Sequence, residues 1–541
     1  MQLFFIFLTA LFVSMVAVAF FMRLAPRLGF VDEPDARKVH VKRVPRGAGI
    51  GMVLGLVASV MAWTDGGHTQ QAFFVGVIVI SVFGLWDDRS DLNYRLKFAG
   101  QLLAVLIAVW YGDVVIERVP LVDDEAVPAF VTYPLTVFFL LGTTNAVNLS
   151  DGLDGLAAGL SLLSLVCIAG LSHLSESREP VFLAVAIMGG VLGFLRFNTH
   201  PAQVFMGDTG SQFLGFSLGV LAVILTQRAN TALAASLPLL ALGLPIVDTL
   251  TVMVQRMARG QSPFKPDRNH FHHKLLTLGF DHHEAVLTIY LIQSLFVISA
   301  YLFRYESEAF LLVYYGVLAA AIVLSYPLAQ ACRWRLHSGR PAGASLPSRV
   351  VGMLRSAVGI EKYSRWAVGI AIPAFLVVGA FQAEDIGSDT GYAAVAILVA
   401  ALAFRLMRLP VINPVERLAI YFCVILAVYS MESQAVTQPE WQSGLNWFYL
   451  ALTLSIGLGV RFSGGHYFAL TPSDYLVMLI LLAAANLSVF EGTNYAKLAA
   501  ESAVMLYGVE FVLRKPRFTS RVLWGGAMGA FVLVALKTVS V

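Results

Sequence analysis

Three carboxylates within five residues, Asp87, Asp88 and Asp91, follow an apolar run (72–86) where a predicted membrane helix ends. Charged groups at this position are costly unless they have a function. Lys97 follows a few residues later. Oxygen ligands suit a hard cation such as Mg²⁺, and a lysine neutralises phosphate charge, so the segment indicates metal-dependent phosphoryl transfer. The simpler alternative is a solvated loop rich in acids, because Asp-Asp-x-x-Asp patterns also arise by chance.

Two further polar segments follow apolar runs. In 145–159, Asp151 and Asp154 are three positions apart and would share one face of a helical turn, near Asn148 and three glycines. Capping of a helix start would explain one aspartate but not the whole set. In 205–211, Asp208 precedes a predicted helix. It is either an N-cap or a metal ligand beside glycine amides that could bind phosphate.

Two loops contain histidine and basic residues. In 267–273, Arg268 precedes His270, His272 and His273, a spacing that suits diphosphate binding or proton handling. A zinc site is the alternative, but no cysteine lies nearby and closely spaced histidines rarely complete a tetrahedral shell alone. In 37–49, Lys38 and His40 lie between an acidic stretch and a glycine-rich entry to the next apolar run.

The composition indicates a polytopic membrane protein. Of 541 residues, 58% are hydrophobic and 13% are charged, and the net charge of +3 is too small to indicate nucleic-acid binding. The three cysteines lie far apart and predict neither a disulfide framework nor a cysteine metal pair. The N-terminus lacks a basic region, so we expect a retained first span rather than a cleaved signal peptide.

Apolar runs predict an all-α bundle of about 18 transmembrane helices. The predicted spans are 3–21, 49–63, 71–86, 97–111, 132–148, 153–172, 181–196, 209–226, 231–254, 285–303, 308–330, 367–381, 391–405, 418–431, 444–460, 475–490, 497–513 and 522–538.

Lysine and arginine are concentrated in alternate loops, which predicts the orientation. Loops 22–47, 255–283 and 331–366 are strongly basic, whereas 64–70 and 382–390 contain no base and 112–131 contains only Arg118. The basic loops are therefore predicted to be cytoplasmic and the N-terminus outside. All the polar segments described above then fall on the cytoplasmic face.

The ordered motifs DEPDARKVH and PRGAG (32–49), DDRSD (87–91), NAVNLSDGLDGLAAG (145–159), FMGDTGS (205–211), PIVDT (245–249) and DRNHFHH (267–273) resemble the polyprenyl-phosphate N-acetylhexosamine-1-phosphate transferases, the WecA/MraY family. The resemblance covers residues 1–330. It implies a bacterial inner-membrane enzyme with a cytoplasmic active site. The enzyme would transfer a sugar-1-phosphate from a UDP-N-acetylhexosamine to undecaprenyl phosphate, releasing UMP.

The resemblance also implies roles for individual residues. It implies Mg²⁺, with Mn²⁺ as a substitute, bound by Asp208 and Asp88. Asp87 and Asp88 would face the lipid phosphate, one of them acting as base. Which one, and whether the reaction takes one step or two, stays open. The residues that would bind substrate are Lys97 at the polyprenyl phosphate, Asp151, Asp154 and Asn198 around the uridine and ribose-phosphate, Arg268, His270, His272 and His273 at the sugar-diphosphate, and Lys38 and His40 on the nucleotide side, together with Asp91 and Asn148.

The third aspartate of DDxxD and the His-x-His-His pattern resemble the WecA-like branch, which predicts UDP-GlcNAc or a related sugar feeding O-antigen or exopolysaccharide synthesis. The alternatives are a phospho-MurNAc-pentapeptide transferase of peptidoglycan synthesis and, from another class, a lipid-linked-sugar flippase. A transporter would place its charges near the bilayer midplane, whereas these lie at one face. Prenyl-chain synthesis needs a second DDxxD, which the chain lacks.

The predicted domains are a transferase core of about 11 spans (1–330), a basic cytoplasmic linker (331–366) and a C-terminal region of about 7 spans (367–541). No motif identifies the last region. We interpret it as a docking module for downstream polysaccharide enzymes or as a second catalytic unit. The expected partners are undecaprenyl phosphate, a UDP-N-acetylhexosamine, the lipid bilayer, those downstream enzymes and a second copy of the chain as a homodimer; nucleic acid is not expected.

Overall fold

The structure is a computed structural model that describes residues 2–33, 43–122, 127–230, 232–262, 269–336, 359–382, 395, 399, 412–462, 495–513 and 518–539. These residues form two compact units. The first contains the helices up to residue 331 and the second contains the helices from residue 360 onward.

Helices make up nearly all of the first unit, with one short antiparallel strand pair in which Val31 lies opposite Pro45. Its elements are α1 (Gln2–Leu28), β1 (Val31–Asp32), β2 (Val44–Pro45), α2 (Ile50–Trp63), α3 (His68–Ser90), α4 (Tyr94–Leu106), the π-helical turn η1 (Ile107–Tyr111), α5 (Ala129–Leu149), α6 (Leu156–Leu174), α7 (Arg178–Asn198), α8 (Gly207–Ile224), the π-helical turn η2 (Leu225–Ala229), α9 (Leu237–Ala241), α10 (Gly243–Ala258), α11 (Phe271–Thr277), α12 (His282–Leu302) and α13 (Glu308–Ala331).

The second unit is also helical. Its helices are α15 (Ile360–Gln382), α17 (Ile412–Thr437), α18 (Pro439–Phe462), α20 (Tyr495–Leu513) and α21 (Phe518–Val539). Helix α15 packs against the other four. The predicted span 475–490 lies outside the described residues, as does 391–405 apart from two helical positions.

Among the described residues, ten helices are long and apolar enough to cross a bilayer, and two shorter apolar helices accompany them. This confirms the prediction of an all-α membrane protein. The predicted total of about 18 spans stays a prediction, because several of the predicted spans fall on residues that the structure does not describe.

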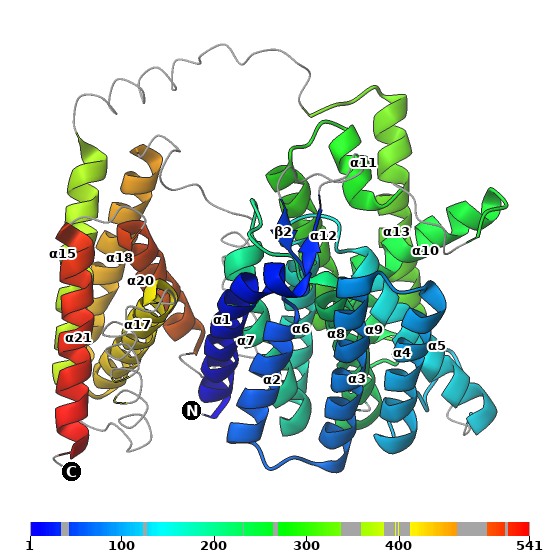
Figure 1. Cartoon of the computed structure of the whole chain (residues 1–541), viewed down its shortest axis with the longest axis horizontal. Coiled ribbons are helices and arrows are strands. Elements are labelled where there is room, and N and C mark those ends of the chain that lie inside the picture. Colours follow the sequence, from blue (N-terminus) through cyan, green and yellow to red (C-terminus); the bar gives the residue numbers. More distant parts are fainter. Residues whose placement is uncertain are drawn as a thin grey trace. The chain divides into compact units, whose positions relative to one another are not determined.

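Helix α8 lies at the centre of the first unit (Figure 1). Every residue from Thr209 to Ile224 is buried, and the helix packs against α3, α5, α6 and α2. Helix α7 lies on the other side of α6 and packs against α1 and α2. A helix that is apolar all round must be enclosed by others. Its N-terminal end, with Gly207 and Asp208, is the end at which the polar segments meet.

The predicted single span 231–254 is wrong in detail, because two helices replace it. Helix α9 ends at Ala241 and α10 begins at Gly243. Pro245 has no N–H with which to continue a helical ladder through this point. The buried Gln293 of α12 bonds to the backbone groups on either side of the break. Its Oε1 accepts from the Leu244 N–H at 3.0 Å, and its Nε2 donates to the Ala241 carbonyl at 3.0 Å.

Helix α13 ends at Ala331 and α15 begins at Ile360. The residues from 360 to 366, which were predicted to be the end of a linker, therefore belong to a helix. The residues between 337 and 358 lie outside the described part of the chain.

Candidate active site

The centre of the site is a lysine between two carboxylates from different helices. Lys97, in the first turn of α4, forms an ion pair with Asp208 Oδ2, and its Nζ lies 3.6 Å from Asp87 Oδ2. Asp87 comes from the last turn of α3 and Asp208 from the first turn of α8. The structure thus brings together three predicted site residues that are up to 121 positions apart, and all three keep part of their side-chain surface accessible.

Amide side chains orient the Asp208 carboxylate. Asn148 Nδ2 donates to Asp208 Oδ1 at 3.1 Å and to Ser211 Oγ at 2.7 Å, and Gln212 Nε2 donates to Asp208 Oδ2 at 3.0 Å. The predicted residue Asn148 therefore acts on Asp208 in this structure. Two carboxylates that face one ammonium group provide hard oxygen donors at one point, which is the donor chemistry that Mg²⁺ prefers.

Asp88 is held differently from its neighbour Asp87. Its side chain is buried, and it accepts from the backbone N–H groups of Asp208 (2.8 Å) and Thr209 (3.1 Å) and from Thr209 Oγ1 (2.6 Å). These donors are the otherwise unpaired N–H and hydroxyl groups at the start of α8. Asp88 thereby anchors the end of α3 to the start of α8, and both of its oxygens are engaged.

Gly207 makes this anchor possible. Its φ of +70° is in the left-handed region, and a Cβ at this position would lie 2.3 Å from Asp88 Oδ2. A side chain there would both strain the backbone and displace the Asp88 carboxylate. The glycine of the Gly-Asp-Thr-Gly motif is therefore explained by the geometry of the anchor.

Arg46 connects the β2 segment to the acidic cluster. Its guanidinium donates to the Asp87 carbonyl at 3.0 Å and to Asp91 Oδ1 at 2.9 Å, and its Nε lies 3.4 Å from Asp88 Oδ1. The backbone beside it joins the loop before α8, because the Phe205 N–H donates to the Pro45 carbonyl. Asp91 itself ends α3 with a left-handed backbone conformation and is exposed.

The loop between α5 and α6 is fixed by Asn198 at the end of α7. The buried Asn198 side chain accepts from the Gly155 N–H at 2.9 Å and donates to the Val204 carbonyl at 2.8 Å. It therefore connects the loop between α5 and α6 with the loop that precedes α8. The Asp151 side chain is exposed in the first of these loops, where a ligand can reach it.

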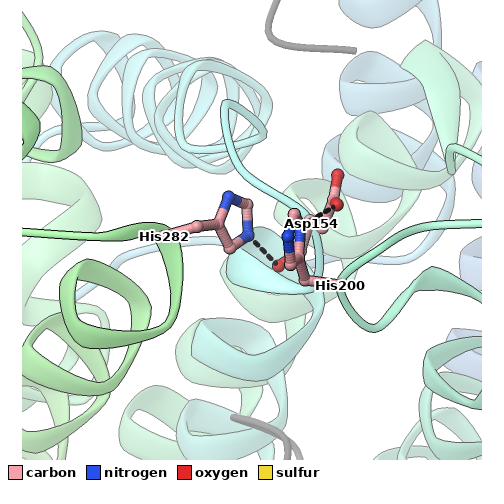
Figure 2. A group of neighbouring side chains, drawn as sticks. All are labelled: Asp154, His200 and His282. Atoms are coloured by element: carbon pink, nitrogen blue, oxygen red, sulfur yellow. Dashed lines mark hydrogen bonds and ion pairs between the residues drawn. The ribbon is translucent and has the colours of Figure 1, made fainter. Parts of the chain in front are cut away.

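Asp154 takes part in a cluster with two histidines (Figure 2). Its Oδ2 lies 2.7 Å from His200 Nδ1 and accepts from the Ala202 N–H at 3.0 Å, and His282 Nε2 lies 3.5 Å from its carbonyl oxygen. Burial alone would raise the pKa of Asp154, but the bonds from His200 and Ala202 lower it below its usual value. Asp154 is thus an anion that joins three segments.

One ligand atom from each of these three residues lies within 4.8 Å of the others, a spacing that a metal ion could bridge. The two imidazole rings, however, are stacked at 3.9 Å with an angle of 23° between their planes. Nearly parallel rings do not direct their nitrogen lone pairs to one point, so metal binding would require the rings to rotate.

The histidine segment meets the α5–α6 loop. His270 Nδ1 lies 2.9 Å from Asp248 Oδ2, and the Phe271 N–H donates to Asp248 Oδ1 at 2.8 Å. His272 is buried against Gly152, where a Cβ would lie 2.3 Å from the imidazole. Burial, followed by the nearby His273, lowers the pKa of His272 to about 3, so this ring is neutral at physiological pH.

Three predicted site residues, Lys38, His40 and Arg268, lie outside the described residues. The other predicted residues gather at one end of the first unit, although Asp154 and His270 face partners that were not predicted. Sequence reasoning missed Arg46, Thr209 and Gln212 at the centre, and His200, Asp248 and His282 around it. Arg46 and Asp248 lie within the motifs PRGAG and PIVDT, so the sequence pattern could have indicated them. His200 and His282 lie in no motif, and the sequence alone gave no indication of their position.

Comparisons with known proteins show which family the chain resembles. The sequence model of the family described as "Glycosyl transferase family 4" matches residues 71–226, which include Asp87, Lys97 and Asp208. The chain is 38% identical over 298 residues to the "Probable undecaprenyl-phosphate N-acetylglucosaminyl 1-phosphate transferase" of Bacillus subtilis (strain 168), a match that covers 54% of this chain and 83% of the relative.

Two other relatives have similar names. The chain is 35% identical over 319 residues to the "Decaprenyl-phosphate N-acetylglucosaminephosphotransferase" of Mycolicibacterium smegmatis, covering 52% of this chain and 78% of the relative. It is 27% identical over 296 residues to the "Undecaprenyl-phosphate alpha-N-acetylglucosaminyl 1-phosphate transferase" of Escherichia coli (strain K12), covering 53% of this chain and 80% of the relative. Each of these matches spans about half of the present chain.

Proposed function

Because the chain belongs to glycosyl transferase family 4, among its polyprenyl-phosphate N-acetylglucosamine-1-phosphate transferases, we propose that it transfers GlcNAc-1-phosphate from UDP-GlcNAc to undecaprenyl phosphate. The products are undecaprenyl-diphosphate-GlcNAc and UMP. The reaction would begin the synthesis of a cell-envelope glycan at the cytoplasmic face of the bacterial inner membrane.

The observation that carries this proposal is the convergence of Asp87, Lys97 and Asp208 from three helices. Phosphoryl transfer needs positive charge at the reacting phosphates and hard oxygen ligands for a cation beside them. The site offers both at the end of a membrane bundle. A lipid phosphate and a soluble nucleotide sugar can meet there without either leaving its own phase.

The carboxylates of Asp208 and Asp87 are the residues that would hold Mg²⁺, or Mn²⁺ in its place. Both face the Lys97 ammonium and keep accessible surface, whereas both oxygens of Asp88 already accept hydrogen bonds from α8. The proposal therefore gives Asp88 the task of positioning α8, rather than the metal-ligand role expected from the family resemblance. When bound, the cation supplies Lewis-acid neutralisation of the diphosphate.

In the proposed reaction a phosphate oxygen of the lipid attacks the β-phosphorus of UDP-GlcNAc. A P–O bond forms to the lipid phosphate, and the bond from that phosphorus to the oxygen bridging it to the α-phosphate breaks, with UMP as leaving group. Lys97 neutralises the lipid phosphate, and Asn148 and Gln212 keep Asp208 oriented. A lipid phosphate is already ionised near neutral pH, so a single displacement needs no general base.

The nucleotide would lie over the α5–α6 loop. Asp151 is exposed there, and the His272 ring lies close to Gly152, which places the histidine segment and the aspartate loop side by side. The neutral His272 ring would act through packing or a hydrogen bond rather than through charge. His273, His270 and Arg268 are the other candidates for the sugar-diphosphate.

Neither alternative function is favoured. The named relatives are N-acetylglucosamine-1-phosphate transferases, not MurNAc-pentapeptide transferases or transporters. The acidic residues gather at helix ends, whereas a transporter would place its binding site near the middle of its spans.

The test is UMP release by the purified full-length chain in lipid. The reaction would contain undecaprenyl phosphate and one nucleotide sugar at a time: UDP-GlcNAc, UDP-GalNAc or UDP-MurNAc-pentapeptide. We expect release with UDP-GlcNAc that requires the lipid phosphate, stops with EDTA and returns with Mg²⁺. Asp208→Asn protein, matched for amount and monodispersity, is the control for contaminating activity.

Each other outcome has a distinct meaning. Release with UDP-MurNAc-pentapeptide alone would replace the proposed donor by the peptidoglycan precursor. Absence of lipid-dependent UMP release with every donor, from protein that is monodisperse, would overturn the transferase assignment. Full activity in EDTA-treated protein would overturn the metal dependence while leaving the transfer reaction in place.

A further inference from the structure

The second unit, to which the transferase proposal gives no task, contains ionisable side chains inside its helical bundle. Two of its helices, α17 and α20, pack together and are joined by ion pairs at two levels. At one level Arg417 Nη1 lies 3.0 Å from Glu510 Oε1; at the other Lys497 Nζ lies 2.8 Å from Glu432 Oε2. The pairing shows that the two helices run antiparallel.

The two levels differ in their charge balance. The first level has one arginine and one glutamate, and Glu510 also accepts a hydrogen bond from Tyr421. The second level has one lysine but two glutamates, because Lys497 Nζ also lies 3.5 Å from Glu501 Oε1. Lys497 is bonded to both oxygens of Glu432 at 2.8–2.9 Å. Lys497 is therefore shared by two glutamates and lies closer to Glu432, so one negative charge of the cluster is not balanced by a cation among the described residues.

Two polar atoms at the second level also lack a hydrogen-bond partner within the described residues. They are Glu501 Oε2 and the Tyr449 hydroxyl of α18. Glu501 and Tyr449 are 6% and 7% exposed, and the Tyr449 hydroxyl is close enough to interact electrostatically with Glu501 and Glu432. A buried polar atom without a partner destabilises the fold, and so does a buried carboxylate whose charge is only partly balanced. Both point to something that completes the cluster.

The cluster lies deep enough for these costs to apply. Helix α17 has 26 residues and spans about 39 Å at 1.5 Å per residue. Glu432 is five residues from its end, which places it roughly 7–8 Å inside the helix end, and the Glu432 and Glu501 side chains are only 5% and 6% exposed. The Lys497 side chain keeps 34% of its surface exposed, so a small ion can reach the cluster.

We propose that Glu432, Glu501, Lys497 and Tyr449 form a binding site for one exchangeable monovalent cation in the second unit. With Glu432 neutralised by Lys497, a single positive charge at Glu501 would balance the cluster. A proton on Glu501 Oε2 supplies that charge and turns the unpaired oxygen into a donor. An alkali ion bound between the carboxylate and the Tyr449 hydroxyl would supply the same charge. The groups that interact with Glu501 come from α17 (Glu432), α18 (Tyr449) and α20 itself (Lys497).

The experiment is carbodiimide labelling of the full-length chain in lipid nanodiscs, followed by mass spectrometry of the modified peptides. Dicyclohexylcarbodiimide reacts with protonated carboxyl groups in apolar surroundings. We expect Glu501 to be labelled at the acid end of a pH series and labelling to fall by about tenfold per pH unit once the carboxyl group ionises. At constant pH, labelling that falls with added Na⁺ or K⁺ assigns the charge to an alkali ion, and labelling that is insensitive to salt assigns it to the proton.

The matched control is Glu510, which has a full arginine partner in the same helix pair. It should stay unlabelled at each pH. Glu501→Gln should abolish the Glu501 label while leaving UMP release unchanged, and Lys497→Met should increase labelling because both glutamates then lack a cation. The wild-type protein alone can overturn the proposal. It does so if Glu501 is not labelled, or if its labelling responds to neither pH nor salt.

Discussion

At the scale of single residues, the three buried or half-buried aspartates of the site are held by different partners. Asp208 and Asp87 face Lys97 with accessible oxygens, whereas Asp88 accepts three hydrogen bonds from the start of α8. Aspartates in one motif can therefore differ in task. Substitution by asparagine, which keeps the shape and removes the charge, should separate these tasks.

We predict that Asp208→Asn lowers the rate of UMP release by about a thousandfold and leaves the thermal midpoint nearly unchanged, because the carboxylate acts on ligands. Asp88→Asn should lower the midpoint as well, because an amide Nδ2 would face the N–H groups of α8 and leave donors unpaired, at about 1–3 kcal/mol. Activity and thermal unfolding of both variants, measured in one detergent, test this. Equal thermal midpoints for the two variants would contradict the assignment of Asp88 to the α8 anchor.

His272 gives a prediction about pH. Its folded-state pKa of about 3 lies below the ordinary value for histidine, so below pH 6.5 the unfolded chain binds a proton that the folded chain does not. This contribution to stability is present above about pH 6.5 and is lost as the pH falls toward about 3, by up to roughly 1.4 kcal/mol per pH unit.

The measurement is the difference in thermal midpoint between the wild type and His272→Gln at several pH values. At neutral pH the wild type should have the higher thermal midpoint. The difference between the two midpoints should shrink as the pH falls from about 7 to about 4. A difference that stays constant over this range would show that the ring is already charged or exposed in the folded state.

At the scale of elements, the break between α9 and α10 depends on one side chain from α12. Gln293→Leu should leave the Leu244 N–H and the Ala241 carbonyl without partners, at about 1–3 kcal/mol for each buried group. We expect a clear fall in the thermal midpoint. Thr288→Ala in the same helix is the control, because its hydroxyl donates to the Glu284 carbonyl of its own helix. A similar, small loss for both would show that the break does not need Gln293.

The same break shows what the sequence could predict. Apolar runs revealed most helices, because a bilayer requires long apolar segments whatever their tertiary contacts. The interruption at residue 242 stayed hidden, since its compensating glutamine lies about fifty positions away. Likewise, the acids and the histidines of the site could be found because charge is rare in such a chain. The link from Asp88 to Thr209, and the pairing of His200 with Asp154, follow only from tertiary packing.

At the scale of the whole molecule, all residues of the candidate active site belong to the first unit, and the relatives match about half of the chain. We predict that a chain truncated after about Ser345 inserts into membranes and still releases UMP from UDP-GlcNAc at a rate within about threefold of the full chain. The reason is that the contacts of Asp87, Lys97 and Asp208 described above come from α3, α4, α5 and α8.

The truncated protein should be compared with the full chain in the same lipid, with Asp208→Asn in both lengths as controls. A truncated protein that is monodisperse but inactive would show that the second unit contributes to the active site. A truncated protein that is active but fails to support glycan assembly in cells would point to a docking role for the second unit.

The position of Lys97 between two carboxylates has a consequence for how ligands bind together. While the ammonium group contacts Asp87 and Asp208, it competes with any cation for the same oxygens. A lipid phosphate that attracts Lys97 would free those oxygens, so phosphate and metal should each raise the affinity for the other by the same factor. Titration of Mn²⁺ by electron paramagnetic resonance should show about tenfold tighter binding with a polyprenyl phosphate, and Lys97→Met should remove this dependence. The lysine would then couple the two ligands: in the empty site it balances part of the carboxylate charge, and the loaded site fills cooperatively.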